Sequence, residues 1–292
     1  MKDSNKKKSS FPSLLLAGTA AVLFVRQLYH VALTRHFVDS KKIPTSFDGF
    51  KILHLSDLHN NRLLCRDDRL ISRIKKLSPD IIVITGDIID SLVPQLDIVA
   101  DFAAKLVKIC DVYYVPGNHE ARIQQRDILF RQLKNAGVKL LFDSREAIVR
   151  NDESITITGI MDPKFEREYS IRKTYANMHI TLKLRDLPPL DESKFNILLS
   201  HKPEHFSIYA NYHYDLIMSG HAHGGQWRIP YIGAIFSPGQ GLFPQYTSGM
   251  YMTGDSTMIV SRGLGNTKFP VRINNPFELV LITLKSDQAE KE

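Results

Sequence analysis

The stretch Ile81-Ile82-Val83-Ile84-Thr85-Gly86-Asp87 places five strand-forming residues directly before a glycine and a carboxylate. An unbroken β-branched run of this kind is typical of a strand that is covered on both faces, as inner strands of α/β domains are. The polar residue that follows then lies where the strand ends. This stretch therefore predicts an α/β fold with Asp87 at the carboxyl end of a buried strand.

The same order of apolar strand and polar loop recurs four times. The further predicted strands are residues 51–55, 112–115, 195–200 and 216–219. The polar residues that follow them are, in order, Asp57 and His59, Asn118 and His119, His201, and His221 with His223. Loops at the carboxyl ends of strands are where α/β folds place their sites. The agreement supports the interpretation of these residues as one site.

Other segments complete an alternating pattern. Helical periodicity predicts helices at residues 66–77, 96–109 and 123–135, the last ending before Gly137. A hairpin is expected from residues 147–150 and 154–160, and strands from 257–261 and 278–284. Residues 35–49, with Pro44 and a turn at Asp48-Gly49, are interpreted as a linker that enters the domain.

Size and composition leave one large domain or two small ones, since the chain has 292 residues of which 43% are hydrophobic. The net charge of +7 owes much to Lys2, Lys6, Lys7 and Lys8. A basic balance can indicate nucleic acid, anionic lipid or a phosphorylated substrate. Because no basic stripe is interleaved with aromatic residues, no nucleic-acid partner is expected. Cys65 and Cys110 are too few and too far apart in sequence to define a disulfide framework or a metal site.

The N-terminus carries a targeting signal. Residues 11–25 are uncharged and largely apolar, and apolar residues continue past Arg26 to residue 33. A full span needs about 20 residues, and a signal peptide or an amphipathic surface segment also fits. We favour a single uncleaved anchor through residues 11–33, with the four lysines inside and the catalytic domain outside the cytoplasm. The expected division is therefore an anchor at 1–36, a catalytic domain at 37–286 and a polar tail at 287–292.

Seven groups in the histidine-bearing motifs can hold divalent metals: Asp57, His59, Asp87, Asn118, His201, His221 and His223. A two-metal hydrolase needs a bridging carboxylate, because one shared anion holds two cations about 3.5–4 Å apart. It also needs imidazoles and carbonyl oxygens to complete each coordination shell. The motifs supply these groups and one additional histidine, His119.

Five ordered blocks make the sequence resemble the calcineurin-like metallophosphoesterase superfamily. They are Asp57-Leu58-His59, Gly86-Asp87-Ile88-Ile89-Asp90, Gly117-Asn118-His119-Glu120, His201 and Gly220-His221-Ala222-His223. The resemblance covers about residues 50–285. It implies a four-layer α-β-β-α sandwich, in which two mixed sheets lie face to face with helices outside.

The resemblance also implies roles. Asp57, His59 and His223 would hold one metal, and Asn118, His201 and His221 the other, with Asp87 as the bridge. His119 would bind the phosphoryl oxygen and act as general acid, oriented by Asp90. Attack by a metal-bound hydroxide would hydrolyse the phosphate ester or pyrophosphate. Mn, Fe and Zn all suit this ligand set.

Further segments are similar to the membrane-associated bacterial phosphohydrolases of the superfamily, which include enzymes like UDP-2,3-diacylglucosamine pyrophosphatase and cell-wall phosphoesterases. These segments are Asp48-Gly49-Phe50-Lys51-Ile52, Gly224-Gly225-Gln226 and Ser261-Arg262-Gly263-Leu264-Gly265. The segment Asn274-Asn275-Pro276-Phe277-Glu278 departs from the sequence pattern of this subgroup, in which Glu directly follows Pro. The similarity implies a phosphorylated small-molecule or lipid-linked substrate.

Several interpretations remain open at this point. The same site could belong to a nuclease or cyclic-nucleotide phosphodiesterase, for which residues 162–186 offer only a small cap, or to a non-catalytic scaffold. Arg262 and Arg272 either contact substrate phosphate or pack beside the site. His54 is expected to pack within its strand, and Asp67, Asp68 and Glu120 to be solvated or helix-start carboxylates.

Overall fold

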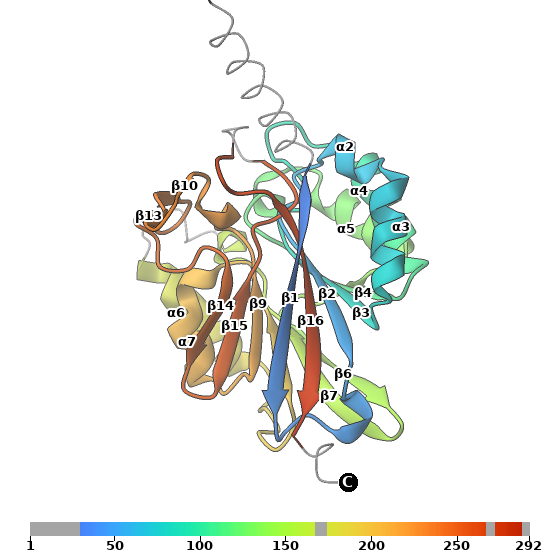
Figure 1. Cartoon of the computed structure of the whole chain (residues 1–292), viewed down its shortest axis with the longest axis vertical. Helices are drawn as coiled ribbons and strands as arrows, with labels where there is room; N and C mark the ends of the chain where they lie inside the picture. The colour runs from blue at the N-terminus through green and yellow to red at the C-terminus, as the bar shows by residue number, and fades with distance from the viewer. Residues whose placement is uncertain (1–29, 167–173, 267–271, 288–292) are drawn as a thin grey trace, which may run out of the picture.

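Two six-stranded mixed sheets form the centre of the computed structural model, which describes residues 30–166, 174–266 and 272–287 (Figure 1). The first sheet has, in spatial order, β1 (Val31–Ser40), β16 (Phe277–Ser286), β2 (Lys51–Leu55), β3 (Ile81–Thr85), β4 (Asp111–Val115) and β5 (Lys139–Leu140). The second has β14 (Gly249–Thr253), β15 (Ser256–Val260), β9 (Leu216–Ser219), β8 (Asn196–Leu199), β7 (Glu153–Gly159) and β6 (Ser144–Arg150). Each sheet mixes parallel and antiparallel pairs.

Helices cover the outer face of each sheet, and the buried apolar residues divide into three clusters that separate four layers. The first sheet is covered by α2 (Arg62–Cys65), α3 (Asp68–Leu77), α4 (Leu96–Val107) and α5 (Arg126–Asn135). The second is covered by α6 (Thr174–Asp186) and α7 (Phe206–Asn211). The middle cluster joins the inner faces of the two sheets through residues such as Val83 and Ile197. The predicted four-layer sandwich is confirmed.

The predicted strands at 51–55, 81–85 and 216–219 coincide with β2, β3 and β9, and the other predicted elements shift at their ends. The helix expected from Arg66 begins at Asp68, because the Asp67 carboxylate accepts the Arg69 N–H at 3.0 Å as its N-cap. The helix expected from Ile123 begins at Arg126, since Glu120–Arg122 forms a separate 3₁₀ turn.

The predicted linker at residues 35–49 is wrong over its first part. Val31–Ser40 forms β1, which pairs in parallel with β16 along its whole length, from Val31 opposite Phe277 to Ser40 opposite Ser286. Alternation is weak in this edge strand, so the period-2 signal of a half-buried strand is missing. Residues 31–36 therefore belong to the sheet, although the predicted anchor includes them.

The remainder of the predicted anchor, residues 1–29, lies outside the described residues. Among the residues that are described, no helix is both long and apolar enough to span a bilayer. The candidate small cap at residues 162–186 includes α6 in its described part. This helix packs Ile180 and Leu184 into the third apolar cluster, so it belongs to the outer layer.

Two small hairpins project beside the carboxyl ends of the second sheet. They are β10 (Arg228–Ile229) with β11 (Gly233–Ala234), and β12 (Phe236–Ser237) with β13 (Gly241–Leu242). Each strand has only two residues, which is too short for a periodic signal in the sequence.

Candidate metal centre

The carboxyl ends of β2, β3 and β4 meet those of β8 and β9, and the predicted ligands converge there from both sheets. Three groups of side chains each place their ligand atoms within 4.8 Å of one another: Asp57, His59 and His223; His59, Asp87 and His119; and Asp87, His201 and His221. Asp87 is shared by the second and third groups and its carboxylate lies between them. The first group is the ligand set predicted for one metal, and the third brings His201 and His221 of the other predicted set together with the predicted bridge, Asp87.

The first group is buried and closely spaced. His223 Nε2 lies 3.2 Å from His59 Nε2 and 3.3 Å from Asp57 Oδ1. His59 Nε2 is also 3.9 Å from Asp87 Oδ2. Burial, partly opposed by Asp87, lowers the pKa of His59 to about 3. His59 is therefore neutral at physiological pH, which is the state in which imidazole can act as a metal ligand.

The third group centres on His201. Its Nε2 lies 3.2 Å from Asp87 Oδ2 and 3.2 Å from His221 Nδ1, while its Nδ1 lies 2.7 Å from the Thr85 carbonyl oxygen. That carbonyl can only accept, so Nδ1 carries a proton and Nε2 faces the site. Burial opposes a charge on His201, but Asp87 and Asp57 raise its pKa to about 10.

Asn118 lies beside the third group. Its side-chain Nδ2 lies 3.3 Å from Asp87 Oδ2. A half-turn of the amide exchanges its nitrogen and oxygen, and a metal requires the oxygen. Nitrogen or oxygen ligands that share one divalent ion at about 2.0–2.2 Å lie roughly 3 Å apart. The spacing and the donor set of both groups therefore fit divalent metal ions.

Backbone conformation at the site is unusual. Asp57, His59, Asp87, His221 and His223 all have positive φ, between 47° and 65°. Residues with a Cβ seldom adopt this region, and such strain persists where the surrounding structure enforces it. Gly220 has a related role, because a Cβ there would overlap the Ser56 hydroxyl and approach the Asp57 carboxylate. The close approach of the two sheets' loops thus requires glycine at this position.

His119 lies at the edge of the centre, with 13% of its side chain exposed and its Nε2 4.0 Å from Asp87 Oδ2. The Ser91 backbone N–H donates to His119 Nδ1 at 3.0 Å, so the neutral ring carries its proton on Nε2. Asp90 Oδ1 is 3.9 Å from that Nδ1 and accepts the Leu92 N–H at 2.8 Å instead. The Ser91 amide, rather than the predicted Asp90 carboxylate, therefore makes the hydrogen bond that sets the His119 tautomer.

Glu120 is a positioning residue that the sequence did not reveal; it begins the 3₁₀ turn Glu120–Arg122, as one of the two expected alternatives had it, but it is not a solvated carboxylate. Its side chain is fully buried. Oε2 accepts the N–H groups of Asp87 at 2.9 Å and Gly117 at 2.6 Å, and Oε1 accepts that of Ile89 at 3.1 Å. Burial and the neighbouring Asp87 raise the pKa of Glu120 to about 7, although the N–H donors oppose this shift. Glu120 thus joins the loop after β4 to the loop that carries Asp87.

The two arginines considered as phosphate contacts are held by protein groups. Arg272 is buried, places its guanidinium 3.3 Å from His223 Nδ1, and lies over the Phe277 ring at 4.9 Å. Arg262 pairs with Glu278 at 3.7 Å. These contacts support the interpretation that both side chains pack beside the site. His54 packs in β2 as expected, fully buried and 2.8 Å from the Thr85 hydroxyl.

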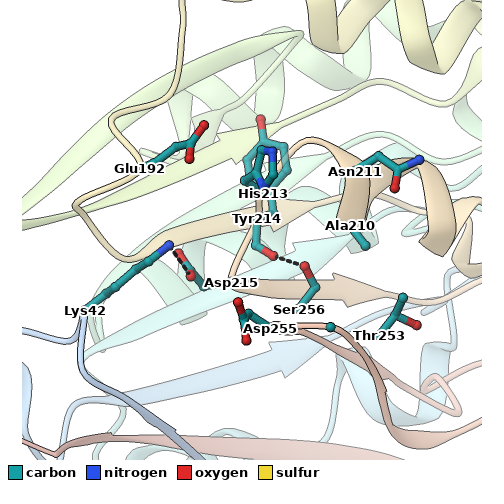
Figure 2. A pocket seen from close by; sticks show the side chains of 11 residues that line it. Lys42, Glu192, Ala210, Asn211, His213, Tyr214, Asp215, Thr253, Asp255 and Ser256 are labelled. Carbon is teal, nitrogen blue, oxygen red and sulfur yellow. Dashed lines mark hydrogen bonds and ion pairs between the residues drawn. The ribbon is translucent and has the colours of Figure 1, made fainter.

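A separate pocket of about 390 Å³ lies where β9 and β15 begin, which is the end of these strands opposite the predicted ligands (Figure 2). Lys42 pairs there with Asp215 at 2.9 Å, and the Ser256 hydroxyl donates to the Tyr214 carbonyl at 2.6 Å. Its lining residues include none of the predicted ligands. The pocket is therefore distinct from the metal centre.

Comparison with known proteins agrees with this geometry. Residues 50–225 match the family model described as calcineurin-like phosphoesterase. The uncharacterized metallophosphoesterase YkuE of Bacillus subtilis (strain 168) is 31% identical over 274 residues, covering 88% of this chain and 86% of the relative. An uncharacterized metallophosphoesterase of Aquifex aeolicus (strain VF5) is 30% identical, covering 89% and 94%. Phosphodiesterase YaeI of Escherichia coli (strain K12) is 25% identical, covering 80% and 82%. The family match includes every predicted ligand.

Proposed function

The chain belongs to the calcineurin-like phosphoesterases, which are hydrolases of phosphoric esters, and from this premise we propose that it is a dinuclear metal-dependent phosphodiesterase. The observation that carries the proposal is the position of Asp87, whose carboxylate belongs to the cluster of His201 and His221 and also lies 3.9 Å from His59 Nε2 of the other ligand set. One shared anion between two ligand sets is what a two-metal site requires.

In this proposal, Asp57, His59 and His223 would hold one divalent ion, Asn118, His201 and His221 would hold the other, and Asp87 would be shared between them. The ions would neutralise charge on the phosphoryl group and supply a nucleophile at neutral pH. The Thr85 carbonyl keeps the His201 Nε2 lone pair directed at the site. Manganese, iron and zinc all suit the mixture of imidazole, carboxylate and amide ligands.

His119 acts on the substrate in this proposal. Its Nε2–H lies beside the bridging carboxylate, where it can donate a hydrogen bond to a phosphoryl or leaving-group oxygen. Burial lowers the pKa of His119, although Asp87 opposes that shift. Full proton transfer as a general acid from the charged ring would require the Ser91 N–H to release Nδ1, because a charged imidazole carries protons on both nitrogens.

An anionic substrate is supported by cations on one side of the centre. Lys164 is half-buried; burial, Arg122 and Lys202 lower its pKa, and Asp162 and Asp87 oppose this shift. Lys202 is buried and lies 3.9 Å from Asp162, so half-buried Lys164 and exposed Arg122 are the cations here that can attract a phosphorylated substrate. Phosphodiester cleavage is favoured because YaeI, one of the similar proteins, is named a phosphodiesterase.

We also propose that the enzyme is held at the cell membrane by the apolar sequence that precedes β1, with the catalytic domain outside the cytoplasm. The support is the run at residues 11–25 after four lysines. A phosphorylated small molecule or a lipid-linked phosphate ester or pyrophosphate of the envelope would then be the substrate.

A substrate panel tests this function. Protein reconstituted with Mn²⁺, Fe²⁺ or Zn²⁺ is assayed on bis(p-nitrophenyl) phosphate, p-nitrophenyl phosphate, a nucleoside-diphosphate lipid, 2′,3′-cyclic AMP and single-stranded DNA. We expect metal-dependent cleavage of the diester, and the matched variant Asp87→Asn should be inactive. Preference for DNA would favour the nuclease alternative. Absence of cleavage of every substrate with metal bound would favour a non-catalytic scaffold.

A further inference from the structure

Exposed apolar side chains gather around the metal centre. Six of them lie on or beside the two small hairpins and are called here the hairpin surface: Trp227, Tyr231, Ile232, Phe236, Leu242 and Phe243. Ile232, Leu242 and Phe243 are 63%, 69% and 72% exposed, and Tyr231 is fully exposed. A contiguous apolar surface of this kind is uncommon on a monomeric soluble protein unless it contacts a partner.

Backbone hydrogen bonds join the segments that carry the hairpin surface. Phe236 pairs with Leu242 across β12 and β13, and the Phe243 N–H donates to the Ile235 carbonyl at 2.9 Å. The Ile235 N–H in turn donates to the Trp227 carbonyl at 3.1 Å. The two hairpins therefore form one unit that presents these side chains together.

This unit contacts the metal centre directly. A Cβ built at Gly239, in the β12–β13 turn, would lie 3.1 Å from His221 Nε2. The Ser237 hydroxyl donates to the carbonyl of Ala222, between the two ligands of that loop, at 3.3 Å. On the other side of the centre, Leu92 and Val93 are 65% and 62% exposed in the loop whose Ser91 amide contacts His119. Apolar side chains thus flank the centre on both sides.

The start of β1 lies at this same end of the molecule. Val31 is paired with Phe277, whose ring lies under Arg272, and Arg272 contacts His223. Figure 1 shows the start of β1 at the end of the sandwich that also carries α2, β10 and β13. Only residues 26–30 separate β1 from the apolar run at 11–25, and five residues span at most about 18 Å. A bilayer that holds this run must therefore lie close to the metal-centre end.

We propose that the hairpin surface docks on a lipid bilayer, so that the metal centre opens toward the headgroups. The inference rests on the proposed membrane-held phosphoesterase and names the partner of its site. Tryptophan and tyrosine are enriched where proteins meet the headgroup region, and aliphatic side chains supply the apolar contact. Docking would present the phosphate of a lipid headgroup to the centre without removing the lipid from the bilayer.

Trp227 is the only tryptophan of the chain and is 43% exposed within this surface, so its fluorescence reports on docking. Full-length protein is mixed with vesicles of phosphatidylethanolamine and phosphatidylglycerol, with and without bromine-labelled acyl chains. We expect the emission to shift to shorter wavelength and to be quenched by the brominated lipid. The double variant Ile232→Glu/Phe243→Glu should still float with the vesicles through residues 11–25 but should lose most of this quenching.

The matched control is Val149→Glu, a change at a 66% exposed apolar residue of β6, which should behave like the unmodified protein. Trp227 that stays equally accessible to acrylamide in vesicle-bound protein would overturn the inference, as would failure to float. Concentration-dependent protection of Trp227 without vesicles would instead mean that a second copy covers the surface. Hydrolysis of bis(p-nitrophenyl) phosphate in detergent, on the same preparations, tests the proposed activity separately.

Discussion

Replacing Glu120 by alanine should both destabilise the protein and inactivate it. The substitution leaves three buried N–H groups, those of Asp87, Ile89 and Gly117, without their acceptor. Each unsatisfied buried donor costs about 1–3 kcal/mol. Three such donors would together cost about 3–9 kcal/mol, and because the loops can relax and admit water, the free energy of unfolding should fall by the lower part of this range, roughly 3–6 kcal/mol. Turnover should fall as well, since the Asp87 backbone loses its anchor.

Glu120→Gln keeps the shape of the side chain and changes its hydrogen bonds. The amide oxygen can still accept two of the three N–H groups, but the amide nitrogen then faces the third donor. The expected loss is about 1–3 kcal/mol, smaller than that for alanine. Urea unfolding, metal content and turnover are measured for both variants beside Glu146→Ala, an exposed glutamate on β6 whose loss should change stability by less than about 0.5 kcal/mol. If Glu120→Ala were as stable and active as that control, the positioning role would be refuted.

Three further results are expected. His119→Ala should lower turnover by about 10²- to 10⁴-fold at unchanged metal content, and loss of both metals in this variant would make His119 a ligand. Burial lowers the pKa of His54 to about 3, with a smaller contribution from His36, so the unfolded chain takes up a proton that the folded chain excludes. Stability should therefore fall as pH drops below 6.5, by about 1.4 kcal/mol per pH unit from this group. Urea unfolding of His54→Gln beside the unmodified protein measures this pH-dependent difference. Parallel pH profiles of the two proteins would contradict the lowered pKa of His54. Removing residues 1–29 should leave Mn²⁺-dependent turnover intact. Removing residues 1–36 deletes part of β1 and should lower the melting temperature. Equal melting temperatures of the two truncated proteins would argue against β1 as part of the fold.

The inner strands could be predicted from sequence because burial on both faces leaves an unbroken apolar run. Ile81–Thr85 is the clearest case, and the ligand-bearing loops follow such strands. The ligand groups could be predicted because their residue types and order are dictated by metal chemistry. Edge strand β1 could not, since one side of it lacks a strand and its residues are mostly polar or half-buried.

Side-chain partners were the part of the centre that sequence could not supply. A buried Glu120 and a solvated one look alike in sequence, and two of its three donors come from residues about 30 positions away. The Ser91 amide is invisible for a related reason, because every residue but proline has a backbone N–H and only the fold aims this one at His119. The hairpin surface was missed because two-residue strands carry no period.

Metal stoichiometry measured together with turnover tests the central claim most directly. Metal-free protein is titrated with Mn²⁺, bound metal is counted by mass spectrometry, and hydrolysis of bis(p-nitrophenyl) phosphate is followed at each point. We predict that activity reaches its maximum only at two ions per chain, and that Asp87→Asn reaches neither that stoichiometry nor that activity. Full activity with one ion per chain, or near-normal turnover of Asp87→Asn at saturating Mn²⁺, would contradict a centre bridged by Asp87.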